Sequence, residues 1–160
     1  MTKLLILSDS HGTMRHMRLA VQRFHPDAIF HLGDHTADAD ALAREIGQPV
    51  LTVRGNCDYA DFDRAETWEC DFEGVRIFAA HGHRFNVKMG LLRFRYAAIE
   101  RGAQLALFGH THQPYCQQYD GLWLLNPGAC SGYAPSCALV EIENGSLSCR
   151  IIDLYSEVTL

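Results

Sequence analysis

The sequence predicts a single α/β domain in which a parallel β-sheet half is joined to an antiparallel half. Short apolar runs alternate with helix-like segments over the first half of the chain, as is typical of βαβ units with right-handed crossovers. The remainder is rich in alternating strands separated by turn residues. A length of 160 residues with 48% hydrophobic residues suits one domain spanning residues 1–160.

The first half is expected to form a βαβαβ pattern. Between the first two apolar runs, apolar residues recur at helical spacing over residues 13–24, and Pro26 closes the segment. A second helical pattern over residues 38–46 has acidic residues in its first turn and Gly47 at its C-terminal cap. The apolar runs that flank these helices cover residues 4–7, 28–32 and 50–54.

The second half is expected to contain mostly hairpins. Two-residue turn signals separate pairs of alternating strands at Glu73-Gly74, Asp120-Gly121 and Asn144-Gly145. A third helix is predicted from Lys88 to Arg101, ended by Gly102. Two facing sheets with helices outside would accommodate both halves. Two further apolar runs cover residues 76–80 and 105–108.

Each of the five apolar runs leads directly into residues that can bind metal. Because ligands of open α/β sheets bind just outside the carboxyl ends of the strands, we expect these clusters to converge on one site. Carboxylate, amide and imidazole groups together are suitable ligands for a metal ion. The candidate ligands are Asp9, His11, Asp34, Asn56, His81, His110 and His112.

Three of the clusters, taken singly, have an equally good structural interpretation. Asp9 or Ser10 is suited to cap the following helix. Asp34 follows a glycine, which is a common way for a loop to begin. Asn56 tolerates turn conformations and often hydrogen-bonds its own backbone. These three clusters therefore support a metal site through their joint occurrence at successive strand ends.

The pair His110 and His112 favours ligation even in isolation. The two histidines lie two residues apart, directly after an apolar run, and a glycine precedes them. Seven candidate ligands are too many for one tetrahedral site, so two metals are the better interpretation. Asp34 is suited to bridge them because a carboxylate offers two oxygens. Mixed nitrogen and oxygen ligands suit manganese, iron, zinc or similar ions.

The remaining histidines are interpreted more conservatively. His16 and His25 belong to a helix and its exit and are expected at the surface. His31 lies within a predicted strand and is expected to be packed or hydrogen-bonded in the core. His35 and His83 adjoin the ligand clusters. Three roles are compatible with that position: contact with the substrate, a hydrogen bond that supports a metal ligand, or no role beyond proximity.

Charge and cysteine content limit the function classes. The formal net charge of −5 argues against extensive electrostatic binding to nucleic acid or to an anionic membrane. A small phosphorylated substrate stays compatible, because bound cations would dominate the local field. The N-terminal apolar run of four residues is too short for a signal peptide or a membrane span. The six cysteines lack paired spacing, so we expect reduced thiols and a cytoplasmic protein.

The ordered motifs resemble those of the calcineurin-like metallophosphoesterase superfamily. The length, the Gly55-Asn56-Cys57-Asp58 segment and Asn126-Pro127-Gly128 look like its small single-domain branch, the YfcE/MJ0936-type phosphodiesterases, to which Vps29 is related. The resemblance covers nearly the whole chain. The motifs that carry it are Asp9-x-His11, Gly33-Asp34, Gly55-Asn56, His81-Gly82-His83 and Gly109-His110-x-His112.

The resemblance implies a four-layer αββα sandwich of two mixed β-sheets flanked by helices. It also implies two divalent metal ions, with manganese the usual ion and zinc, iron or nickel as alternatives. Asp34 would bridge the two ions. The first ion would be held by Asp9, His11, Asp34 and His112. The second would be held by Asp34, Asn56, His81 and His110.

The expected reaction is hydrolysis of a small phosphodiester. Two cations about 3.5–4 Å apart can share a hydroxide that attacks phosphorus in line. Asn56 can both ligate and orient the phosphate. Arg54 and His83 are candidate phosphate contacts, although a structural ion pair for Arg54 is at least as well supported.

Cys57 departs from the pattern of many larger superfamily members. A histidine that helps to protonate the leaving group follows the Gly-Asn pair in those proteins, whereas here that position is Cys57. A thiol is a poorer proton donor than an imidazole at neutral pH. We therefore expect modest activity on poor leaving groups and better activity on activated aryl esters.

Two other functions are compatible with the sequence. The relation to Vps29 suggests a protein-interaction scaffold with a structural or vestigial metal site, but every predicted ligand position carries a competent ligand. A nuclease acting on short nucleic acid is a weaker alternative because of the acidic net charge. Homo-oligomerisation is left open, since no surface for it can be located in the sequence.

Overall fold

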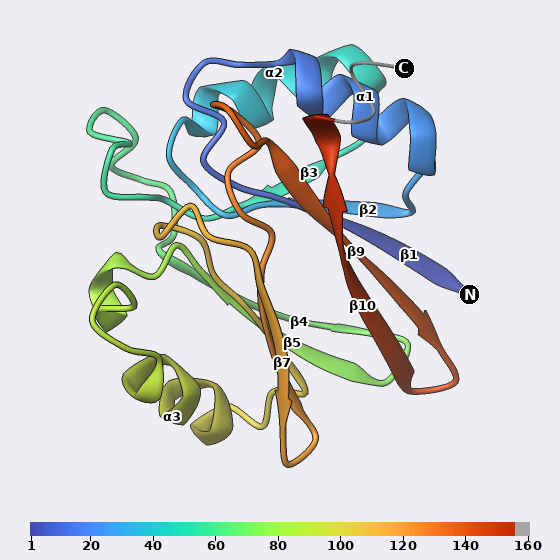
Figure 1. Ribbon diagram of the computed structural model, residues 1–160, viewed down its shortest axis with the longest axis vertical. Coiled ribbons are helices and arrows are strands. Elements are labelled where there is room, and N and C mark those ends of the chain that lie inside the picture. Colours follow the sequence, from blue (N-terminus) through green and yellow to red (C-terminus); the bar gives the residue numbers. More distant parts are fainter. Residues whose placement is uncertain (156–160) are drawn as a thin grey trace.

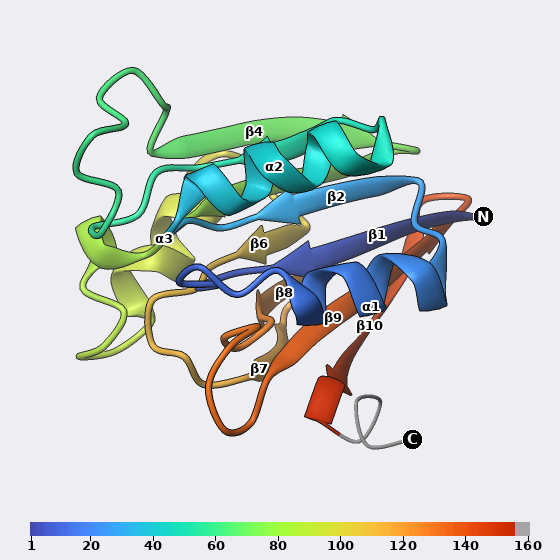
Figure 2. The same cartoon turned by 90° about the horizontal axis from the view of Figure 1, so that it is seen from above.

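The chain folds into two five-stranded β-sheets packed face to face with helices outside. A computed structural model describes residues 1–155. Its helices are α1 (Arg15–Phe24), α2 (Thr36–Ile46), α3 (Leu92–Glu100) and the 3₁₀ helix η1 (His83–Phe85). Figures 1 and 2 show α1 and α2 on the outer face of one sheet and α3 on the far side of the other. The predicted four-layer αββα sandwich is therefore confirmed.

Each sheet mixes parallel and antiparallel pairs. The first sheet has the order β10-β9-β1-β2-β3 and the second has the order β4-β5-β6-β8-β7. Strands of the first sheet are β1 (Thr2–Leu7), β2 (Ala28–His31), β3 (Val50–Thr52), β9 (Ser136–Glu143) and β10 (Ser146–Asp153). Strands of the second sheet are β4 (Thr67–Phe72), β5 (Val75–Ala80), β6 (Leu105–Leu107), β7 (Tyr115–Tyr119) and β8 (Leu122–Asn126).

Alternation along the strands divides the core into three apolar layers. In β1, Leu4 and Ile6 face the second sheet, while Leu5 and Leu7 face the helices. The helix-facing layer includes Met17 of α1, and all of these side chains are fully buried. A third layer, between the second sheet and α3, is built on stacked Phe78 and Phe94 rings 5.6 Å apart.

Three hairpins form at the predicted turns. β4 pairs with β5, β7 with β8, and β9 with β10, each across a two-residue turn. Both residues of each turn have positive φ, as in Asp120 and Gly121 at 50° and 85°. Such turns match the right-handed twist of the flanking strands, so these pairings follow from local sequence.

Three of the sequence predictions need correction. The third helix begins at Leu92 instead of Lys88, because Gly90 has a φ of 154° that no helix accommodates. The first helix begins at Arg15, two residues later than predicted. The antiparallel strands are also not confined to one half of the fold, since β9 joins the first sheet beside β1.

The parallel strands place the ligand clusters at one edge of the molecule. β1, β2 and β3 run parallel in the first sheet, as do β5, β6 and β8 in the second. Their carboxyl ends therefore meet where the two sheets face each other. Among the described residues, no helix is long and apolar enough to cross a membrane.

Candidate metal centre

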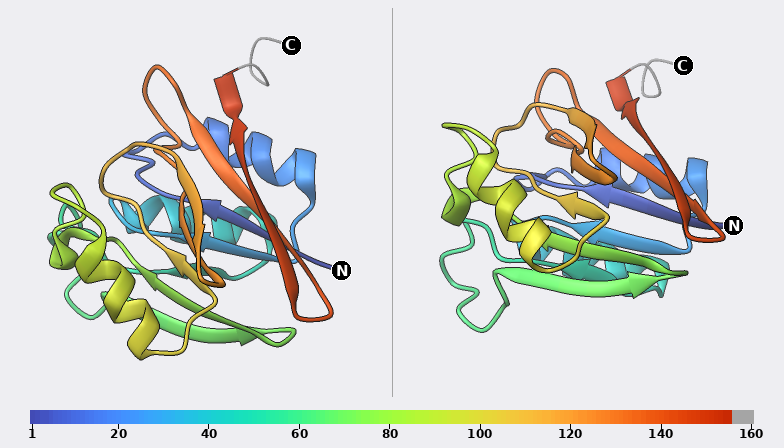
Figure 3. Two further views of the ribbon diagram at one scale, coloured as in Figure 1. Left: turned by 60° about the horizontal axis from the view of Figure 1, so that its bottom comes forward. Right: turned by 90° about the horizontal axis from the view of Figure 1, so that it is seen from below.

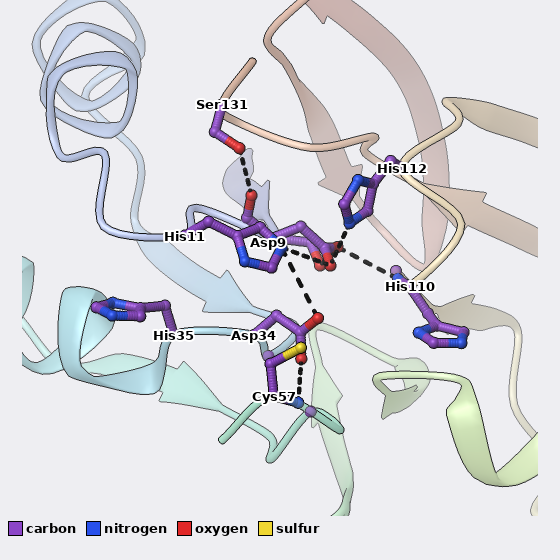
Figure 4. A network of polar contacts seen from close by, with 12 residues as sticks. Asp9, His11, Asp34, His35, Cys57, His110, His112 and Ser131 are labelled. Atoms are coloured by element: carbon purple, nitrogen blue, oxygen red, sulfur yellow. Dashed lines mark hydrogen bonds and ion pairs between the residues drawn. The ribbon is translucent and has the colours of Figure 1, made fainter. Parts of the chain in front are cut away.

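The loops at the converging strand ends hold five predicted ligands in an unusual backbone conformation. Asp9, His11, Asp34, His110 and His112 have φ values of 54°, 47°, 61°, 69° and 62°. The left-handed region costs a non-glycine residue about 1–3 kcal/mol, and such strain clusters at functional sites. Figure 4 shows the side chains of Asp9, His11, Asp34 and His112 directed toward one another, with the His110 ring lying to one side.

Four of the predicted ligands form one tight cluster. One ligand atom from each of Asp9, His11, Asp34 and His112 lies within 4.8 Å of the others. Nε2 of His112 lies 3.1 Å from Oδ1 of Asp9, and Nε2 of His11 lies 3.8 Å from Oδ2 of Asp34. These are the four residues that the resemblance assigns to the first metal. Their donor set of two carboxylates and two imidazoles suits a transition-metal dication.

His81 faces the same cluster from the second sheet. Its Nδ1 donates a hydrogen bond to the Leu32 carbonyl oxygen at 2.7 Å, so Nε2 is the nitrogen that would carry the lone pair in the neutral ring. Nε2 lies 3.5 Å from Oδ1 of Asp34. A backbone hydrogen bond that fixes the tautomer in this way is typical of metal-binding histidines.

Two buried polar atoms at this site are unsatisfied. Oδ1 of Asp9 and Nε2 of His81 form no hydrogen bond within residues 1–155, and both side chains are fully buried. Buried polar atoms are almost always paired, so each unpaired one needs a physical reason. Cations bound at the cluster would satisfy these atoms, one coordinated by Asp9 and the other by His81. The residues present therefore fit a metal.

Charge coupling within the cluster keeps the carboxylates ionised. Burial alone would raise the pKa of Asp34, but His81 and the Cys57 backbone N–H outweigh it and hold that pKa well below its usual range. Burial likewise opposes ionisation of Asp9, yet His112 and His81 lower its pKa. Metal ligation requires carboxylates in this ionised form.

The other two predicted ligands are His110 and Asn56. The ring of His110 is 5.0 Å from that of His81, and its backbone N–H donates to Asp9 Oδ2 at 3.2 Å. Burial and the neighbouring His81 lower the pKa of His110 to about 4. Asn56 is exposed, and its side-chain amide lies 3.6 Å from Sγ of Cys57.

Comparison with known proteins identifies the family of the chain. The model of the calcineurin-like phosphoesterase superfamily domain matches residues 2–145. The chain belongs to this superfamily. A probable metallophosphoesterase of Bacillus subtilis, YsnB, is 31% identical over 98% of both chains. The phosphodiesterase YfcE of Escherichia coli is 28% identical over 82% of this chain and 80% of its own.

Solved structures agree with this assignment. A predicted phosphoesterase from Streptococcus pneumoniae superimposes with a TM-score of 0.82 at 27% identity, covering 96% of this chain and 90% of its own. Vps29 from Entamoeba histolytica gives a TM-score of 0.77 at 20% identity, covering 94% and 98%. The predicted family is confirmed, and the likeness to Vps29 shows the shared fold alone.

Asp58 holds the loops of the metal centre in place, although the sequence predicts no role for it. Its buried carboxylate accepts hydrogen bonds from four backbone N–H groups. Oδ1 accepts from His35 and Thr36 at 2.7 and 2.9 Å, which satisfies the N-terminus of α2. Oδ2 accepts from Asp34 and Gly55 at 2.9 and 2.7 Å. Asp58 thus clamps the Asp34 loop to the Asn56 loop. In the sequence it stands out only as the last residue of the Gly55-Asn56-Cys57-Asp58 segment.

Asn126 holds the loop that carries His110 and His112. Its buried amide donates to the Gly109 carbonyl oxygen at 3.1 Å and to the Thr111 hydroxyl at 3.0 Å. Its oxygen accepts from the Gly128 backbone N–H at 2.8 Å. In the sequence Asn126 stands out only as part of the Asn126-Pro127-Gly128 motif, because its partners are brought together by the fold.

The capping alternative for the first cluster is wrong. The N-cap of α1 is Met14, and neither Asp9 nor Ser10 caps that helix. The Ser10 hydroxyl instead donates to Asp38 at 2.7 Å and contacts Nε2 of His31 at 2.9 Å. His31 is fully buried, as predicted, and burial lowers its pKa to about 4.

The more peripheral histidines lie close to their predicted positions. His25 is exposed, whereas His16 is half-buried and thus less accessible than expected. Nδ1 of His35 lies 2.8 Å from Oδ1 of Asp38. His83 lies 5.5 Å from the His81 ring, so it borders the site without joining the four-residue cluster.

The remaining predicted site residues, Arg54 and Cys57, flank Asp58. Nε of Arg54 donates to the Asp58 carbonyl oxygen at 3.1 Å, and its guanidinium lies over the Phe62 ring. Cys57 is exposed as a residue, but partial desolvation of its thiol together with the Asp34 charge raises the pKa of that thiol. Both residues lie at the rim of the cluster.

Backbone packing around the cluster leaves no room for larger residues. A Cβ at Gly55 would lie 2.2 Å from Oδ1 of Asp34, so Gly55→Ala must displace that carboxylate. We expect the substitution to weaken Mn²⁺ binding by roughly 10–100-fold in a calorimetric titration. Gly121→Ala is the comparator, because a Cβ there meets open space at a φ of 85°. It should cost about 1 kcal/mol of stability and leave Mn²⁺ affinity unchanged. Equal Mn²⁺ affinities in the two variants would contradict this packing argument.

Proposed function

We propose that the chain is a phosphodiesterase that uses two divalent cations, with manganese as the working ion. One observation carries the proposal. The two oxygens of Asp34 face different ligand groups, with Oδ2 3.8 Å from His11 and Oδ1 3.5 Å from His81. A carboxylate in that position is suited to bridge two cations.

Two sets of side chains would hold the ions. The first ion would be held by the four-residue cluster of Asp9, His11, Asp34 and His112. The second ion would be held by Asp34, Asn56, His81 and His110. When bound, paired cations lower the pKa of a coordinated water and neutralise phosphoryl oxygens, which is what in-line hydrolysis requires. Asn56 would also orient the phosphate through its amide. His83 and Arg54 are proposed to contact the phosphate at the rim.

A pocket beside the site is the proposed location for the alcohol group of a small phosphodiester. A pocket of about 400 Å³ opens beside the site. Cys57 lines it next to the cluster, and Tyr59 and Arg64 line it farther out. Arg64 is held there by Asp40 at 2.7 Å and Asp61 at 2.8 Å. We propose that the leaving group of the substrate occupies this pocket.

Cys57→His tests whether this position donates the proton to the leaving group. An imidazole in place of the thiol is expected to raise turnover of esters with poor leaving groups by roughly 10-fold or more, and to change the pH profile. Activated aryl esters should change little, because their leaving groups need no proton. Cys57→Ser serves as the control of similar size. Unchanged turnover and pH profile in Cys57→His would exclude this position as the acid site.

Hydrolysis of bis-p-nitrophenyl phosphate tests the proposed function as a whole. The purified chain should hydrolyse this diester with added Mn²⁺ and lose the activity on treatment with EDTA. A matched assay with p-nitrophenyl phosphate measures whether diesters are preferred over monoesters. Activity that persists after EDTA treatment and removal of metal by dialysis would refute a metal-dependent enzyme.

The scaffold alternative makes a different experimental prediction. A scaffold would capture a protein partner at fixed stoichiometry from source lysate and would show no turnover under the same Mn²⁺ conditions. The complete set of ionised carboxylates and imidazoles favours the enzyme, because a vestigial site has no need to retain all of them. Turnover without such a partner would rule out the scaffold as the main role.

A further inference from the structure

Helix α3 carries a row of apolar side chains that face solvent. Leu92, Tyr96 and Ile99 are 59%, 57% and 51% exposed, and Met89 in the preceding turn is 84% exposed. Steps of four and three residues place the three helical side chains on one face. We call these four residues the α3 stripe. Figure 3 shows α3 on the outer side of the second sheet, where no other element of residues 1–155 lies over it.

The α3 stripe is not needed for packing within the chain. The opposite face of α3 contributes the fully buried Phe94 and Ala98 to the core. Large apolar side chains scattered singly over a surface need no explanation, but a contiguous row points to a contact. The stripe also lies on a different element from every proposed metal ligand.

One flank of the stripe carries two side chains of opposite charge that form no ion pair within residues 1–155. Arg93 and Glu100 each follow a stripe residue directly, so they lie on the same flank, seven residues apart. Both are exposed, and within residues 1–155 neither takes part in an ion pair. Arg95 on the other flank is already engaged, with its guanidinium 4.4 Å from the Tyr119 ring. The flank that carries Arg93 and Glu100 is therefore the one whose charges are available to pair with those of a partner.

We propose that a second copy of this chain docks on the α3 stripe, with the two α3 helices antiparallel about a two-fold axis at Tyr96. This arrangement sets Leu92 of one subunit against Ile99 of the other. The same symmetry pairs Arg93 with Glu100 twice. A two-fold interface must be self-complementary, and the charge order along α3 meets that requirement.

The contact is expected to be weak. One helix face provides a small interface, and interfaces that bury less than about 1,200 Å² in total are typically transient. A concentration-dependent homodimer with a dissociation constant in the micromolar range follows. Metal binding and hydrolysis by the monomer do not depend on this dimer, so the dimer proposal is independent of the proposed function.

Sedimentation equilibrium with charge-reversal variants tests the proposal. Arg93→Glu and Glu100→Arg should each weaken the homodimer by about 10-fold or more, because like charges then face each other. An equimolar mixture of the two variants should recover association, since each then supplies the opposite charge. Arg44→Glu on α2 is the matched control and should leave the dissociation constant unchanged. Tyr96→Glu should abolish the dimer.

Two results would overturn the proposal. If the wild-type chain stays monomeric at the highest attainable concentration, the α3 stripe does not bind a second copy of the chain. A dimer that is insensitive to Tyr96→Glu and to both charge reversals would place the interface on another face. Circular dichroism and thermal melting of each variant establish that it is folded, so that loss of association reports on the interface.

Discussion

Asp34→Asn is expected to reduce turnover of bis-p-nitrophenyl phosphate by at least about 10²–10³-fold. The substitution keeps the shape of the side chain but removes the negative charge that faces both ligand groups. His11 and His81 lie 3.8 and 3.5 Å from its two oxygens, so one change weakens both proposed metal positions. The measurement is turnover at saturating Mn²⁺, together with metal content by mass spectrometry.

Asp120→Asn is the matched control for this substitution. Asp120 lies in the β7–β8 turn, fully exposed, at a φ of 50° that asparagine adopts readily. It should retain full activity and metal content. If Asp34→Asn kept wild-type turnover, Asp34 could not be the bridging ligand.

Asp58→Ala is expected to lower the free energy of unfolding by about 3–5 kcal/mol. Removal of the carboxylate leaves four backbone N–H groups without their acceptor, and three of these lie in the segment that carries Asp34 into α2. The melting temperature should fall by about 10 °C. Mn²⁺ affinity should fall as well, because the Asp34 and Asn56 loops lose the clamp between them.

Two further variants separate the clamp from a general effect of substitution. Asp58→Asn retains one oxygen acceptor but turns an NH₂ group toward backbone donors, so its loss of stability should be intermediate. Asp63→Ala, at an exposed position of the same loop, should change the free energy of unfolding by less than about 0.5 kcal/mol. Equal stability of Asp58→Ala and Asp63→Ala would contradict the role of the carboxylate.

The features predicted well from sequence are those with a local physical cause. Asn144 and Gly145 have positive φ and form a two-residue hairpin turn, a conformation those residue types favour. The convergence of Asp9 and His112 follows from a general property of parallel strands, whose carboxyl ends share an edge. Four proposed ligands accordingly lie within 4.8 Å of one another.

The features that escaped prediction depend on contacts between distant segments. Leu4 of β1 pairs with Val140 of β9, and no local pattern specifies that pairing. The four hydrogen bonds of Asp58 come from backbone groups that only the finished fold brings together. The start of α3 was misplaced for a more local reason, since the φ of Gly90 interrupts a sequence that otherwise favours a helix.

The number of Mn²⁺ ions bound per chain tests the proposed two-cation site most directly. Metal-free protein titrated with Mn²⁺ in a calorimeter, and checked by metal analysis, should bind two equivalents. Hydrolysis of bis-p-nitrophenyl phosphate should be absent without metal and should appear as both positions fill. Binding of one equivalent or none at saturating Mn²⁺, or hydrolysis by the metal-free protein, would contradict a site in which Asp34 joins two cations.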